Sequence, residues 1–160
     1  MAEERTLILI KPDGLIKSLT GNIITALSET KLKIVGAKII KVSRELAEKH
    51  YSDLKSRLME KFGKEKGLEV FESTLNYIQG KFHTDRVFAL VYKGENAVQL
   101  VRKIVGETNP EKASPVSIRG KFGRIHSETK VFENVIHCSD SQENAKKEIE
   151  LWFKPEEIVE

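Results

Sequence analysis

The residue best suited to chemistry on a phosphate group is His137. It ends a predicted strand at residues 131–137 and precedes a helix whose start is marked by a capping box of Asp140 and Glu143. A strand end beside a helix N-terminus offers backbone donors and a favourable dipole to a phosphate. A neutral imidazole has a free lone pair near neutral pH, so His137 could act as a nucleophile on phosphorus. For a histidine taken alone, a partly buried ring hydrogen-bonded to the backbone is the simpler interpretation.

Four further side chains could work with His137 in a phosphate site. Lys11 directly follows the first apolar strand, Arg102 lies on a predicted helix, and Arg119 lies in the long loop after that helix. Lysine provides a compact charge and arginine a planar fork, which together suit a triphosphate, although each residue alone reads as a solvated surface group. Glu148 borders the apolar stripe of the last predicted helix. It is either an ordinary surface acid or a hydrogen-bond acceptor for one ring nitrogen of His137. In the second case it would fix the tautomer and leave the other ring nitrogen free to attack.

Several familiar phosphate and metal motifs are missing from the sequence. It contains no P-loop, no dinucleotide-binding glycine motif after a strand and no protein-kinase catalytic motif. The four histidines are scattered without a His-x-x-x-His pair, and the single cysteine, Cys138, excludes an internal disulfide and a cysteine-based zinc site. Cys138 adjoins His137, but neighbours on a strand point to opposite faces, so no Cys–His dyad is expected. Any nucleotide chemistry must use another design.

Composition limits the class of protein. The chain has 160 residues, 39% of them hydrophobic and 32% charged, which predicts one domain spanning residues 1–160. The 27 lysines and arginines against 24 acids give a net charge of only +3, which weakens nucleic-acid and membrane-surface readings. The N-terminus is acidic and lacks a signal-peptide core, so we expect a cytoplasmic location.

Hydrophobic periodicity predicts alternating strands and helices. Residues 56–67, rich in lysine, glutamate and glycine, read as an exposed insertion, and residues 107–129 read as a long irregular loop of functional type. The pattern favours one sheet covered by helices but does not decide between a ferredoxin-like antiparallel sheet and a doubly wound parallel one. The predicted strands cover residues 6–10, 34–42, 87–92 and 131–137, and the predicted helices cover residues 20–30, 46–54, 68–78, 97–105 and 140–152.

Four segments resemble the signatures of the nucleoside diphosphate kinase family. They are Lys-Pro-Asp-Gly at residues 11–14, Gly-Glu-Thr-Asn-Pro at 106–110, Ser-Ile-Arg-Gly at 117–120 and Asn-Val-Ile-His-Cys-Ser-Asp-Ser at 134–141. They stand in the family's order, and the similarity runs from residue 5 to about residue 158. The resemblance implies an α/β (α+β), ferredoxin-like fold with a four-stranded antiparallel sheet covered by helices. It also implies transfer of the γ-phosphoryl group of a nucleoside triphosphate, typically ATP, to a nucleoside diphosphate through a phosphohistidine, in a ping-pong reaction that maintains nucleoside triphosphate pools.

The resemblance also assigns roles to individual residues. His137 matches the nucleophile, Glu148 the acid that orients it, and Ser139 a serine that hydrogen-bonds in the same cluster. Magnesium is implied as an ion carried by the nucleotide phosphates, without protein ligands of its own, and a homo-oligomer built from dimers, a hexamer or a tetramer, is implied as the assembly. The residues that match those holding phosphates and ribose are Lys11, which also joins the catalytic set, Tyr51, Arg102, Thr108, Arg119 and Asn134.

Some positions depart from the family pattern. The usual Arg-Pro-Phe-Phe after the tyrosine helix is absent; Val70 aligns with the base-stacking position and Phe71 lies beside it, so no base-stacking residue is assigned. The stretch of residues 123–133 is longer than usual. Cys138 replaces a glycine or alanine, and its thiol would make activity sensitive to oxidation. The altered base-binding segment and Cys138 leave open an inactive relative that binds nucleotides or partners. Sequence-specific DNA binding has little support from the balanced charge.

Overall fold

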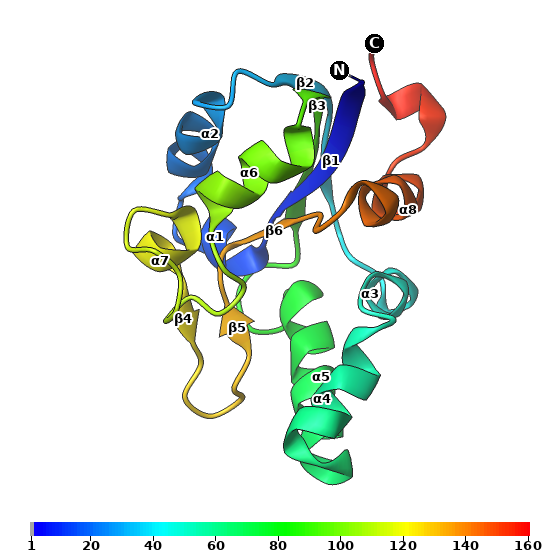
Figure 1. Ribbon diagram of the computed structural model, residues 1–160. Coiled ribbons are helices and arrows are strands. Elements are labelled where there is room, and N and C mark those ends of the chain that lie inside the picture. Colours follow the sequence, from blue (N-terminus) through cyan, green and yellow to red (C-terminus); the bar gives the residue numbers. More distant parts are fainter. Residues whose placement is uncertain (1) are drawn as a thin grey trace.

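The computed structural model describes residues 2–160, which alternate between short strands and helices (Figure 1). The strands are β1 (Glu3–Ile10), β2 (Lys33–Ile40), β3 (Val87–Glu95), β4 (Arg124–Ile125), β5 (Phe132–Glu133) and β6 (Ile136–Cys138). The helices are α1 (Pro12–Ile16), α2 (Thr20–Ser28), α3 (Arg44–His50), α4 (Leu54–Phe62), α5 (Lys64–Ile78), α6 (Ala97–Val105), α7 (Ile118–Phe122), α8 (Gln142–Trp152) and the 3-10 turn η1 (Pro155–Glu157).

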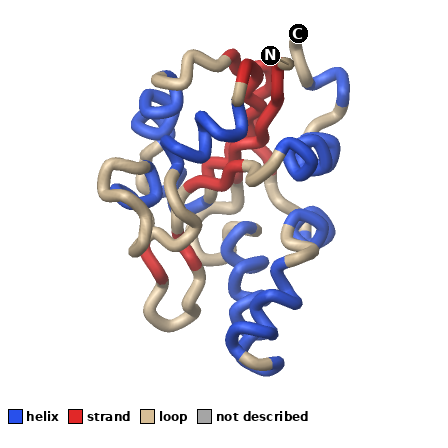
Figure 2. Tube along the Cα trace, in the orientation of Figure 1, coloured by secondary structure: helices blue, strands red, loops and turns tan. Residues whose placement is uncertain are grey.

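The main sheet has four strands in the order β2-β3-β1-β6, and each neighbouring pair is antiparallel. Figure 2 shows these strands at the centre of the molecule with helices around them. The ferredoxin-like antiparallel sheet implied by the resemblance is therefore confirmed, and the parallel alternative is wrong.

Strand β1 is apolar throughout its second half because both faces of the sheet are covered. Leu7 and Leu9 face one core, and Ile8 and Ile10 face the other, as the two-residue period of a strand requires. The first core is closed by apolar residues of α3, α5 and α8, and the second by those of α2, α6 and α7. Lys11 follows this strand, so the rigid centre of the sheet fixes where its backbone lies.

The predicted strand at residues 131–137 is interrupted, which corrects the sequence-based expectation. Residues 132–133 pair with β4 in a separate two-stranded sheet, and only residues 136–138 join the main sheet beside β1. Between them, Val135 has a φ of 60°, a left-handed conformation that is costly for a β-branched residue. Its carbonyl accepts a hydrogen bond from the Lys11 amide at 2.9 Å, and its amide donates to Oδ2 of Asp13 at 3.1 Å. These buried bonds hold the chain at the bend.

Three other local predictions need correction. The expected helix at residues 46–54 is two helices, because α3 ends at His50 and α4 begins at Leu54. The loop at residues 107–129 contains α7 and β4. Helix α8 is capped by Ser141, whose Oγ accepts a hydrogen bond from the Asn144 amide at 3.1 Å, instead of by the predicted capping box.

The segment at residues 56–67 is part of a helical hairpin formed by α4 and α5. It spans the end of α4 and the start of α5, and α4 buries none of its residues, so its predicted exposure holds although it is helical. Gly67 lies where the two helices touch, since an added Cβ would come within 2.5 Å of the Cα of Met59. In Figure 1 this hairpin and the β4–β5 hairpin extend from the same end of the sheet.

Candidate active site

A cavity of about 640 Å³ lies between the sheet and the two hairpins. That volume falls in the range of small-molecule sites. Its wall includes eight of the nine site residues predicted from the sequence: Lys11, Tyr51, Arg102, Thr108, Arg119, Asn134, His137 and Glu148. Residues that are as many as 137 positions apart in the chain thus meet around one space.

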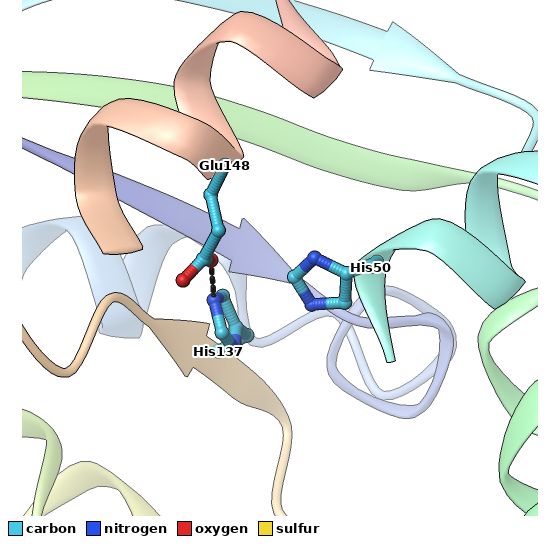
Figure 3. Close-up of side chains that lie close together, drawn as sticks. All are labelled: His50, His137 and Glu148. Atoms are coloured by element: carbon cyan, nitrogen blue, oxygen red, sulfur yellow. Dashed lines mark hydrogen bonds and ion pairs between the residues drawn. The ribbon is translucent and has the colours of Figure 1, made fainter. Parts of the chain in front are cut away.

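The centre of the cavity is the pair of His137, on β6, and Glu148, on α8 (Figure 3). Nε2 of the histidine and Oε2 of the glutamate are joined by a short hydrogen bond, and the two side chains are only 20% and 16% exposed. An ionised carboxylate accepts, so this bond places the proton of the imidazole on Nε2. Nδ1 is then the nitrogen that keeps a free lone pair.

Electrostatics keep His137 unprotonated. Burial, with the nearby positive charges of Lys11 and Arg119, holds the pKa of His137 well below its usual value. Burial also raises the pKa of Glu148 to about 7, with Asp140 acting in the same direction and His50 opposing it. A neutral imidazole beside a carboxylate that ionises near neutral pH is suited to nucleophilic attack.

Lys11 is a buried cation at the floor of the cavity. It is 6% exposed, its Nζ donates to Oδ1 of Asn134 at 2.7 Å, and it lies 5.5 Å from the centre of the Tyr77 ring. Burial, reinforced by Arg119, lowers the pKa of Lys11 to about 7, while Asp13 opposes the shift. Since a nearby anion favours the charged form, an incoming phosphate would bring this lysine fully to its ammonium state.

Arg119, in α7, is fixed by the backbone around the site. Its Nε and Nη2 donate to the carbonyl of Ile136 at 3.2 and 3.0 Å, and its Nη1 donates to the carbonyl of Gly106 at 3.1 Å. Burial lowers its pKa. Arg102 reaches the same cavity from α6 and is exposed. The site therefore combines a fixed buried guanidinium with one that is open to solvent.

Asn134 connects the lysine with the loop on the opposite wall. Its amide oxygen accepts from Lys11, and its Nδ2 donates to the carbonyl of Thr108 at 2.8 Å. Tyr51 supplies a buried hydroxyl that has no hydrogen-bond partner among the described residues, and burial raises its pKa. An unsatisfied buried hydroxyl is costly in a folded protein, so it is suited to a ligand group that can pair with it.

Ser139 stands apart from the other predicted site residues. It is fully buried, and its Oγ accepts a hydrogen bond from the Leu7 amide at 3.1 Å. This bond joins the end of β6 to β1, the strand that leads to Lys11. The hydrogen bond of the Ser139 hydroxyl therefore aligns β6 with β1.

Cys138 points away from His137. It belongs to the core on the α6 side of the sheet and is 5% exposed, as expected from strand alternation. Burial raises the pKa of its thiol. Because the thiolate is the oxidisable species, this environment disfavours the oxidation sensitivity suggested by the sequence.

Two contributors were missed by sequence reasoning. His50, treated as one of four scattered histidines, lies with its ring centre 4.5 Å from that of His137. Asp13 is fully buried, and one of its carboxylate oxygens accepts a short hydrogen bond from the Tyr77 hydroxyl. The position of His50 directly before Tyr51 is a local signal, but only the fold reveals its distance to residue 137.

The two hairpins form a slot of the cavity that is lined by apolar side chains together with charged ones such as Arg57 and Lys130. A flat apolar group such as a nucleobase suits a slot of this kind. Phe71, beside the aligned position, is instead in the core. The apolar side chains of the slot are Leu58, Phe62 and Val70 from the helical hairpin and Val131 and Phe132 from the β4–β5 hairpin.

Taken together, an unprotonated histidine, buried cations and a nearby slot with apolar side chains suit a phosphotransferase site that accepts nucleotides. A family model described as nucleoside diphosphate kinase matches residues 4–158. The chain is 44% identical over 157 residues to a nucleoside diphosphate kinase of Pyrococcus furiosus, covering 98% of this chain and 87% of that protein. It is 43% identical to one of Staphylococcus carnosus, covering 97% of this chain and 90% of that protein. The chain belongs to the nucleoside diphosphate kinase family and is an enzyme of that class.

Solved structures agree with this assignment. An NDP kinase from Pyrobaculum aerophilum superposes with a TM-score of 0.85 at 31% identity, covering 99% of this chain and all of that one. A Borrelia burgdorferi nucleoside diphosphate kinase with bound vanadate and ADP, described as a transition-state mimic, gives a TM-score of 0.82 at 33% identity, covering 99% of this chain and 91% of that one. No helix among residues 2–160 has the length and apolar character needed to cross a membrane.

Proposed function

We propose that this enzyme transfers the γ-phosphoryl group of a nucleoside triphosphate, typically ATP, to a nucleoside diphosphate through a phosphohistidine at His137. The observation that carries the proposal is the hydrogen bond from Nε2 of His137 to Glu148, which leaves Nδ1 free beside buried cations. The bound vanadate and ADP of the Borrelia relative support the same reaction at an equivalent fold.

In each half of the reaction, one bond to the γ-phosphorus forms as another breaks. The Nδ1 lone pair attacks the γ-phosphorus, a nitrogen–phosphorus bond forms, and the bond to the bridging oxygen breaks, so that the diphosphate leaves with the electron pair. The ring gains positive charge, which ionised Glu148 stabilises through the Nε2 proton. A second diphosphate then attacks the same phosphorus in the reverse direction, and Nδ1 recovers its lone pair.

The cations and hydroxyls have distinct tasks in this proposal. Lys11, Arg102 and Arg119 neutralise phosphate charge, and the rigid anchoring of Arg119 reduces reorganisation during transfer. Tyr51 and Thr108 offer hydrogen bonds to phosphate oxygens. Asn134, with Lys11, faces the ribose. Because these contacts concern phosphate and sugar, discrimination between bases would be weak.

Magnesium enters this proposal on the nucleotide. In the part of the chain that the structure describes, the one group of three side chains close enough to share an ion is His50, His137 and Glu148. Two imidazoles suit transition metals better than Mg²⁺, which prefers oxygen and water. The residues present therefore fit an ion held by phosphate oxygens, whose charge it would neutralise during transfer.

Three further expectations from the sequence stay predictions. They are the maintenance of nucleoside triphosphate pools, the cytoplasmic location, and a homo-oligomer, hexameric or tetrameric, built from dimers. Light scattering on the purified protein would distinguish the two assemblies. The reading of residues 56–67 as an insertion within a single domain also remains a proposal, supported by their exposure.

The direct test is labelling with γ-³²P ATP. We expect an acid-labile, base-stable label on the wild-type protein and none on His137→Asn. His126→Asn is the matched control, because His126 lies on the β4–β5 turn and bonds only to nearby backbone amides. Equal labelling of His137→Asn would overturn the proposal, and ADP binding without labelling would favour an inactive relative.

A further inference from the structure

His50 lies against the proposed nucleophile, His137, but has no role in the reaction proposed above. It ends α3, and its ring makes edge contacts with those of His137, Tyr51 and Trp152 at centre distances of 4.5, 4.7 and 5.4 Å. Figure 3 shows it beside the His137–Glu148 pair. A ring nitrogen of each histidine and a carboxylate oxygen of Glu148 all lie within 4.8 Å of one another.

The protonation state of His50 is set by Trp152. The indole Nε1 donates to Nδ1 of His50 at 3.1 Å. An indole nitrogen is only a donor, so Nδ1 must accept and carries no proton. A neutral His50 therefore has its proton on Nε2. Burial and the neighbouring His137 lower the pKa of His50 well below its usual value, which keeps the ring neutral.

This tautomer argues against a metal ion between the three groups. A metal bound at Nε2 of His50 requires the proton to move to Nδ1, where the indole N–H already points. The arrangement favours a donor at Nε2 instead, on a ring that has a nitrogen within 4.8 Å of both His137 and Glu148.

We propose that His50 is a positioning residue for phosphoryl transfer: Trp152 fixes the tautomer with the proton on Nε2, and this N–H supports the ionised carboxylate of Glu148. The ring also packs on one edge of the His137 imidazole and limits its rotation. This inference rests on the proposed function, because it assigns His50 a role in that reaction.

The groups around this pair come from several elements. Glu148 lies on α8. Its pKa is raised by burial, lowered by His50, which belongs to α3, and raised by Asp140, which lies just before α8. Together with burial, Lys11, Arg102 and Arg119 lower the pKa of His137, and Asp140 opposes them. Of these groups, only His50 offers a neutral N–H whose orientation is fixed by another side chain.

The test compares four proteins: wild type, His50→Phe, His50→Gln and Trp152→Phe. Phenylalanine keeps a ring but loses the donor, and glutamine restores an amide N–H near the position of Nε2. Trp152→Phe keeps His50 but removes the bond that fixes its tautomer. Thermal unfolding first establishes that each variant is folded.

The readout is the pH profile of phosphohistidine formation from ATP in a single turnover. Loss of the donor makes Glu148 harder to ionise, so the acidic limb in His50→Phe should move up by about 0.5–1 pH unit. The rate at about pH 6 should fall roughly threefold to ninefold, with a smaller change on the alkaline side. His50→Gln should recover most of the wild-type profile. A role limited to packing would lower the rate at all pH values without moving the limb.

A spectroscopic measurement tests the tautomer apart from activity. Two-dimensional ¹⁵N NMR of histidine-labelled wild type should give the pattern of an Nε2–H tautomer for His50, and Trp152→Phe should shift it toward a mixture. An Nδ1–H pattern in the wild type, or an unmoved pH limb in His50→Phe, would overturn the proposal. Absence of any label on the wild type would instead overturn the proposed function.

Discussion

The buried bond between Tyr77 and Asp13 makes a quantitative prediction. Asp13 is fully buried and accepts from the Tyr77 hydroxyl and from the Val135 amide. Tyr77→Phe removes one of these two donors and leaves a buried carboxylate partly unpaired. A hydrogen bond to a charged group contributes about 1.5–3 kcal/mol. For a domain of this size, each kcal/mol lowers the melting temperature by about 2–4 °C. We therefore expect a loss of about 3–12 °C.

The assay is thermal unfolding followed by circular dichroism, with urea unfolding as a second measure of the free energy. Tyr92→Phe is the matched control: Tyr92 is 2% exposed in the opposite core, and no hydrogen bond of its hydroxyl is recorded among the described residues. It should change the unfolding free energy by less than about 0.5 kcal/mol. If Tyr77→Phe is as stable as Tyr92→Phe, the buried carboxylate of Asp13 does not depend on the tyrosine donor and this reasoning is wrong.

Three other predictions follow from the site. Lys11→Met keeps the apolar stem but removes the charge that would neutralise the phosphates. Labelling of the protein at subsaturating ATP should therefore slow about 100-fold. An unchanged labelling rate in rapid-quench experiments would exclude the lysine from phosphate neutralisation. Gly67→Ala would place a Cβ within 2.5 Å of the Cα of Met59 and separate α4 from α5, which line the nucleotide cavity. The KM for ATP should therefore rise about tenfold while labelling at saturation changes less. Gly21→Ala, with open space around it, is the control, and equal KM values would show that the hairpin does not shape nucleotide binding. Cys138 is buried and its thiol pKa is raised, so we expect the thiol to be unreactive. Cys138→Ala should therefore leave inactivation of the enzyme by dilute hydrogen peroxide unchanged. If the substitution protects the enzyme, the thiol is reactive and this expectation is wrong.

The pH dependence of labelling has a definite sign. Glu148 must be ionised and its pKa lies at about 7, so the rate should fall as pH drops through that region. Lys11 must be charged and its pKa also lies at about 7 in the free enzyme, so kcat/KM for ATP should fall as pH rises above it. A bell-shaped profile of kcat/KM is expected, and Lys11→Met should lose the alkaline limb. A profile that is flat between about pH 5 and pH 9 would contradict both assignments.

The sequence predicts the parts of the fold that depend on local pattern. The run at residues 6–10 is apolar at every position after Thr6, and it becomes the central strand β1 because both of its faces are buried. The break in the strand at residues 131–137 could not be read in this way. Val135 has high strand propensity, and its left-handed conformation depends on Asp13 and Lys11, which lie more than 120 positions away.

The site shows the same division. The signature segments named His137, Arg119 and Asn134, and the fold brings them to one cavity. The task of Ser139 could not be read from its segment, because its partner is the amide of Leu7 on another strand. His50 was missed because no spacing rule links it with residue 137; their proximity arises only when α3 and β6 meet at the end of the sheet.

The most direct test of the central claim is a rapid-quench measurement with ATP alone and no acceptor. The account predicts that the enzyme forms phosphohistidine and releases one ADP for each active site, and that a later addition of a second nucleoside diphosphate removes the label from His137 into the new triphosphate. Transfer that requires both nucleotides to be present, with no label on the protein beforehand, would contradict the covalent mechanism.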